Sequence, residues 1–195
     1  MIPTPIQNKQ QLNKFRFSFG LIICLLAWPF AVVAQSENDP LETEFERLME
    51  SAKDLRLKGE YDMAYTVLDS AYDLSQGLGQ EALIADAASQ IGVIKMYQGA
   101  YSDALKKLHE GLIIRENIKD SVGMAASYNY IASVHHAQTD YEIAIDYYGK
   151  TQVIQEKLIA DSVLFNVRLL GITYNNIGSL YADLGTYNKA IKYLD

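Results

Sequence analysis

The side chains of this sequence that could do chemistry are amides and hydroxyls that recur at three places along the chain. Asn and Gln each present a donor and an acceptor, so they can bond the backbone of an extended peptide whatever its sequence. The alternative is that these residues are solvated polar positions on an unoccupied face. The candidate binding residues are Gln90, Asn129, Tyr130, Ser133, Asn175, Asn176 and Ser179.

Catalytic and metal-binding arrangements are not indicated. His135 and His136 are adjacent, so on a helix their side chains would point about 100° apart, whereas helical metal pairs usually stand three or four residues apart. No nucleophile stands at a set spacing from a base, and no Gly-rich phosphate loop lies between a strand and a helix. The sequence therefore predicts no enzyme, no metal site and no other cofactor.

The elements that must position the candidate residues are copies of one repeat. The pattern Gly-x-Tyr-x-x-Ala begins at Gly59, Gly99 and Gly185, with Thr139 in place of Gly in one copy, so the starts are 40, 40 and 46 residues apart. Such a period is typical of stacked arrays, and each copy predicts a helical hairpin. A second small residue stands twelve positions before each Ala, where the two helices are expected to cross; the pairs are Ala52–Ala64, Gly92–Ala104, Ala132–Ala144 and Gly178–Ala190.

Each hairpin turn needs a residue in the left-handed conformation, which Gly adopts without steric cost. In the copy that lacks this Gly, we expect Asp140 to tolerate the geometry of the turn. Asp120-Ser121 and Asp161-Ser162 are candidate helix N-caps. We expect the aromatic residues after the turns to be buried between hairpins; they are Tyr61, Tyr101, Tyr141 and Tyr187.

Helix is predicted throughout the chain after Pro40, because the residues from Leu41 to Asp195 contain no proline. The expected helices are 41–58, 61–76, 81–98, 101–118, 122–138, 141–160, 163–184 and from 187 onward. The apolar run Val163–Ile172 would project beyond the regular stack.

These copies resemble the tetratricopeptide repeat in its longer form. The resemblance is closest at TYNNIGSLYADLGTYNKAIKYL (Thr173–Leu194) and good at SYNYIASVHHAQTDYEIAIDYY (Ser127–Tyr148). It implies an all-α fold, an α-α superhelix of helix-turn-helix hairpins, which acts without catalysis as a protein-protein interaction module. It also implies that the first helix of each hairpin lines a concave groove, which would hold the candidate residues and Ser89.

Some members of this family bind a terminal carboxylate through Lys, Arg and Asn at set positions in the groove. The matching positions hold a single base and disfavour that ligand; they are Met49, Lys53, Gln90, Ala126 and Tyr130.

The first 34 residues read as a secretory signal peptide. Lys9, Lys14 and Arg16 precede the apolar run Phe17–Val33, and cleavage is expected after Ala34. The alternative is an uncleaved anchor, because the run approaches the length that spans a bilayer. We therefore predict an exported, periplasmic bacterial protein, or one that is anchored to the membrane.

The organisation expected is a signal peptide over 1–34, a linker over 35–40 and a repeat array over 41–195, with four hairpins of which the last is incomplete. Beyond residue 34 the chain holds 14 bases and 24 acids, so its net charge is 14 − 24 = −10. This charge repels nucleic acid and anionic lipid.

The expected partner is therefore a protein or a peptide, and any membrane contact would come through the leader or a missing C-terminal part. The alternative function is the sensory N-terminal region of a membrane-bound signalling protein, a histidine kinase or a helix-turn-helix regulator, truncated after residue 195.

Overall fold

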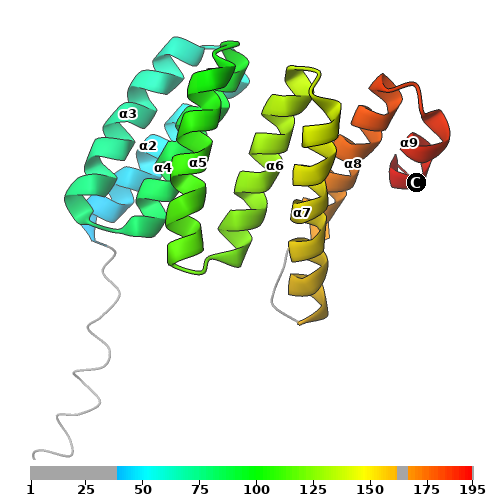
Figure 1. Ribbon diagram of the computed structural model, residues 1–195. Helices are drawn as coiled ribbons and strands as arrows, with labels where there is room; N and C mark the ends of the chain where they lie inside the picture. The colour runs from blue at the N-terminus through cyan, green and yellow to red at the C-terminus, as the bar shows by residue number, and fades with distance from the viewer. Residues whose placement is uncertain (1–38, 162–166, 195) are drawn as a thin grey trace, which may run out of the picture. The chain divides into compact units, whose positions relative to one another are not determined.

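Helices make up almost all of the computed structural model, which describes residues 39–161 and 167–194 (Figure 1). The predicted all-α fold is confirmed, and the helices begin and end within about four residues of the expected positions. The predicted signal peptide and most of the linker lie outside the described residues, as do Val163 and the residues up to 166. The helices are α2 (Pro40–Leu57), α3 (Tyr61–Leu78), α4 (Glu81–Tyr97), α5 (Tyr101–Asn117), α6 (Ser121–Ala137), α7 (Tyr141–Ala160), α8 (Val167–Asp183) and α9 (Tyr187–Leu194).

The turn within each hairpin has the same backbone geometry. Gly59, Gly99 and Gly185 adopt the expected left-handed conformation, with φ between 69° and 78°. The copy without Gly also makes the turn, but Thr139 (φ 64°) adopts this conformation, and the expectation for Asp140 was wrong. Two backbone bonds fix the turn: Thr139 N donates to His136 O at 3.0 Å and Asp140 N donates to His135 O at 2.9 Å.

The predicted helix crossings are confirmed at the small residues. A Cβ built on Gly92 would lie 2.7 Å from Leu108 Cγ and 3.0 Å from Ala104 O, so this position has no room for a side chain. Gly178 is equally restricted, because its Cβ would lie 2.7 Å from Leu194 Cγ. The two helices of a hairpin therefore meet backbone to backbone where the repeat pattern places small residues.

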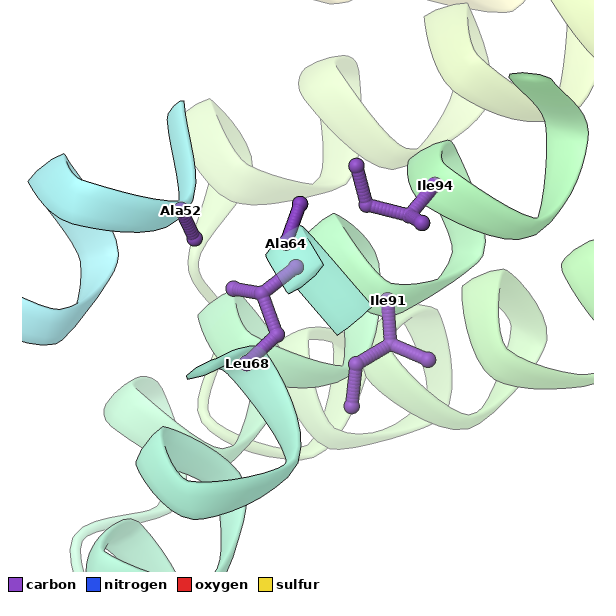
Figure 2. Close-up of a cluster of buried hydrophobic side chains, with 5 residues drawn as sticks. All are labelled: Ala52, Ala64, Leu68, Ile91 and Ile94. Atoms are coloured by element: carbon purple, nitrogen blue, oxygen red, sulfur yellow. The ribbon is translucent and has the colours of Figure 1, made fainter. Parts of the chain in front are cut away.

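The apolar core continues from one hairpin to the next. Figure 2 shows one cluster, in which Ala52 of α2 and Ala64 and Leu68 of α3 pack with Ile91 and Ile94 of α4. Two further clusters join α5 to α6 and α7 to α8 in the same way. Because these hairpins complete their cores with a helix of the next, they depend on their neighbours for stability.

The repeat tyrosines are only in part buried as expected. Tyr61 stacks on Tyr97 of the next hairpin, with ring centroids 5.3 Å apart, and Tyr101 and Tyr141 are half-buried against the core. Tyr187 is 66% exposed, so the expectation of burial was wrong there.

The helices form two layers. The first helices of the hairpins contact one another, α4 with α6 and α6 with α8, whereas α3, α5 and α7 each lie between the helices that precede and follow them in the chain. A stack whose first helices approach more closely curves toward them, which gives the predicted α-α superhelix its concave face. Asp120 caps α6 as predicted, accepting a bond from Gly123 N at 2.9 Å, whereas Asp161 ends α7 and Ser162 lies outside the described residues. No described helix is long and apolar enough to cross a membrane.

Candidate binding groove

The concave face carries a surface hollow of about 490 Å³ between α2, α4 and α6, which we call the amino-terminal hollow. Gln90 and Tyr130, both half-buried, border it. Lys53 also borders it, but its Nζ lies 2.8 Å from Glu50 Oε1. The base at the carboxylate-binding position therefore already has an acidic partner.

Two of the candidate amides bond to each other across the groove. Asn176 Nδ2 of α8 donates to Asn129 Oδ1 of α6 at 3.0 Å, and Asn129 Nδ2 donates to Thr173 Oγ1 of α8 at 3.0 Å. Both bonds join the third hairpin to the fourth. Asn129 and Asn176 therefore position α8 against α6 and retain only part of their bonding capacity for a ligand.

The remaining candidates divide into packed and exposed residues. Ser133 Oγ donates to Asn129 O at 2.9 Å and lies 3.1 Å from Tyr148 Oη, a buried hydroxyl whose pKa is raised by burial. Asn175 and Ser179 of α8 are exposed on the last first helix. Ser89, which the repeat phase also placed in the groove, is buried and donates to Ala85 O at 2.7 Å.

A second hollow, of about 150 Å³, lies where α6, α7 and α8 meet, and we call it the seam hollow. Its lining is mainly apolar, and Gln155 of α7 is its most buried polar member, with 4% of its surface exposed. Gln155 Oε1 is buried and has no hydrogen-bond partner among the described residues. The described residues that line it are Val122, Ala126, Asn129, Tyr130, Gln155, Leu169 and Ile172.

The preceding seam, where α4, α5 and α6 meet, is closed by a buried arginine. Arg115 Nη1 donates to Gly123 O at 3.0 Å and to Ser127 Oγ at 2.6 Å, and Nη2 donates to Asp86 Oδ1 at 2.5 Å. We call this group, with Asp120 3.8 Å from Arg115 Nε, the arginine lock. It ties three helices of two hairpins together.

The two seams are built from the same repeat positions. Gln155 follows Thr139 by sixteen residues, as Arg115 follows Gly99, and Ala126 likewise corresponds to Asp86. On the far side of the seam, Leu169 and Thr173 correspond to Gly123 and Ser127, since the last spacing is 46 residues. In the later seam the partners of the lock are thus replaced mainly by apolar residues, and the seam hollow remains.

Sequence analysis missed both seams, although a signal was present. Ser75, Arg115 and Gln155 stand 40 residues apart, and all three are polar at a position that the structure buries. A polar residue recurring inside an apolar helix face indicates a special environment. The repeat pattern alone does not show that this position of the second helices is buried, because polar residues there are also compatible with an exposed helix face.

The histidines occupy packing and pairing positions. His135 stacks on Tyr147 with centroids 5.9 Å apart, and His136 Nε2 lies 2.8 Å from Asp183 Oδ2. Within 39–161 and 167–194, no group of three or more metal-binding side chains gathers.

Comparison with known proteins agrees with this architecture. The model of the tetratricopeptide repeat family matches residues 83–157. The hairpins on either side of this match continue the same α-α superhelix, the fold of tetratricopeptide repeats. No curated protein sequence matches the chain.

Several solved structures share the fold. BtubC from P. vanneervenii is 17% identical, with a TM-score of 0.65 over 95% of this chain and 74% of its own. A Rap protein complexed with Competence and Sporulation Factor is 16% identical, with a TM-score of 0.70 over 80% of this chain and 42% of its own. The tetratricopeptide-repeat domain of Arabidopsis FLU is 24% identical, with a TM-score of 0.55 over 60% of this chain and 99% of its own.

Proposed function

We propose that this protein is a non-catalytic interaction module that binds an extended segment of a partner protein across its concave face. The observation that carries the proposal is a set of polar side chains that lie on three first helices: Gln90 of α4, Tyr130 of α6 and Asn175 of α8. Amide and hydroxyl groups at these positions can pair with the donors and acceptors of a peptide backbone. The Rap protein of the same fold, which binds a factor, supports the proposal.

The contacts give these side chains two different roles. Asn129 and Asn176 are bonded to each other and hold α6 against α8, so they shape the groove. The side chains of Gln90, Tyr130 and Asn175 make no hydrogen bond to another described residue, so we propose that they face the bound segment. The excess of acids makes a neutral or basic segment the better partner.

The test uses a displayed library of random twelve-residue peptides, from which a binding peptide is selected and its affinity measured by fluorescence anisotropy. Gln90→Ala with Asn175→Ala should weaken binding at least tenfold, because two backbone contacts are lost. The matched control is Asn117→Ala with Gln152→Ala, two amides of the second helices, which should bind as the parent does. Equal affinity of both double variants would contradict the groove as the binding surface.

We also propose that the protein is exported, because the basic and apolar leader ends in small residues at Ala34. N-terminal sequencing of the protein from a bacterial periplasmic fraction should then begin at Gln35. An intact Met1 in the membrane fraction would instead support the anchor. Reading the gene beyond the codon for Asp195 separates a free module from the sensory region of a membrane-bound signalling protein.

A further inference from the structure

The seam hollow has no role in the interaction function proposed above, although its shape and its chemistry restrict what could bind there. Val122, Ala126, Leu169 and Ile172 supply apolar walls, and among the described residues no charged side chain belongs to the lining. An occupant must therefore offer an uncharged and mainly apolar surface to these walls.

One buried hydrogen-bond acceptor at the seam hollow has no partner among the described residues. Gln155 belongs to α7, which lies behind α6 and α8, and its Oε1 has no donor among the described residues. A buried acceptor without a partner costs free energy until a donor reaches it. An occupant that carries a donor at its inner end would remove this cost.

The size of the hollow limits the occupant further. A volume of about 150 Å³ is below the roughly 300 Å³ at which sites for drug-sized ligands begin, whereas an engineered apolar cavity of about 150 Å³ binds benzene. One six-membered ring therefore fits. The preceding seam holds a flat, donor-bearing group at the same repeat position, the guanidinium of Arg115.

We propose that the seam hollow receives the phenol ring of a tyrosine on the bound segment, whose hydroxyl donates to Gln155 Oε1. This inference rests on the proposed interaction function, since it names a side chain of the segment that the groove binds. The ring lies against the walls from α6 and α8, and the hydroxyl takes the position that a guanidinium group has in the arginine lock. The seam hollow is thus an anchor pocket beside the polar groove.

The first test needs no peptide. It uses p-cresol and toluene, which reproduce the side chains of tyrosine and phenylalanine, titrated into the full chain and followed by ¹H–¹⁵N correlation spectra. Wild-type protein should bind p-cresol with shifts at Ala126, Leu169 and Ile172. Gln155→Leu should lower the ratio of p-cresol to toluene affinity about tenfold, because only p-cresol loses a hydrogen bond.

Two variants of α6 provide the blocking experiment and its control. Ala126→Phe fills the hollow and should abolish binding of both probes, whereas Ala137→Phe, three turns along the same helix, should leave both affinities unchanged. Circular dichroism shows that each variant is folded. An unchanged affinity ratio in Gln155→Leu, or binding by Ala126→Phe, would overturn the proposal.

The remaining outcomes separate this inference from the function on which it rests. If peptides bind through Gln90 and Asn175 but p-cresol does not enter the hollow, the anchor pocket is wrong and the groove stands. If p-cresol binds but no library peptide does, the proposed function fails instead. Sedimentation of the protein alone gives a third result: a dimer that Ala126→Phe dissociates would show that a second copy fills the hollow, and would overturn the tyrosine.

Discussion

Replacing Gly123 by Ala tests the arginine lock with a single methyl group. The Cβ would overlap the Asp120 carboxylate and would lie 2.5 Å from both Cδ and Nε of Arg115. The arginine side chain is 5% exposed, so these atoms have no free space into which to move. The methyl group therefore competes directly with the N-cap of α6 and with the guanidinium.

The magnitude follows from the contacts at risk. Loss of the Asp120 cap costs about 1 kcal/mol, and each hydrogen bond from a charged donor is worth about 1.5–3 kcal/mol. Against this, Ala is better than Gly in a helix by about 0.5–1 kcal/mol. If the cap and one bond of Arg115 are lost, the free energy of unfolding falls by about 1.5–3.5 kcal/mol, which lowers Tm by about 3–14 °C.

The matched control is Gly149→Ala in α7, where an added Cβ meets nothing within 4 Å. This variant should gain about 0.5–1 kcal/mol, because only the helix preference changes. Thermal and urea unfolding, followed by far-UV circular dichroism, measure both variants. The reasoning is refuted if Gly123→Ala is as stable as Gly149→Ala, because the side chain of Arg115 would then move without any loss of stability.

Three further results are expected. Thr139→Gly should stabilise the protein by about 0.5–1 kcal/mol, because the left-handed conformation costs a residue with a Cβ about 1–2 kcal/mol and Gly returns part of this as entropy; an unchanged urea midpoint would show that the turn is unstrained. Burial, with nearby His135, lowers the pKa of His109 below 6.5, so the unfolded state binds this proton more readily, and stability should be lost as the pH falls through 6.5. The loss between pH 7.5 and 5.5, as measured by urea unfolding, should be smaller in His109→Gln, and an equal loss would contradict the assignment. Gln155→Leu should raise the free energy of unfolding of the ligand-free protein by about 1 kcal/mol, because it removes a buried acceptor without a donor; a lower melting temperature would mean that Oε1 is satisfied in the free protein.

The fold was predictable because the turn and the helix crossing of each hairpin depend on residue types within that hairpin. Gly at the turn and a small residue at each side of the crossing are needed wherever the hairpin occurs, so their recurrence predicts the array. Thr139 shows the limit of this reasoning. The backbone bonds at His135 and His136 are strong enough to impose the turn on a residue that disfavours it.

For the candidate site, the sequence predicted which residues share one face of the array but not which of them contact one another. The repeat phase places Gln90, Tyr130 and Asn176 at one position and Asn129 and Asn175 at another. It does not say that Asn176 bonds Asn129, because that contact depends on how the fourth hairpin is set after the longer spacing of 46 residues. Side-chain reach across a seam is a property of packing, which one repeat does not encode.

The interfaces between neighbouring hairpins also differ in how tightly they are packed. In a stack whose stability is a sum of terms from each repeat and each neighbour interface, cooperativity depends on the weakest interface. The arginine lock fills the seam between the second and third hairpins, whereas the seam between the third and fourth keeps an unfilled hollow at Gln155. Native-state hydrogen exchange should therefore show α8 and α9 opening before α4 to α7. A ligand bound in the seam hollow would therefore stabilise the interface between the third and fourth hairpins. As a result, α8 and α9 would unfold together with α4 to α7.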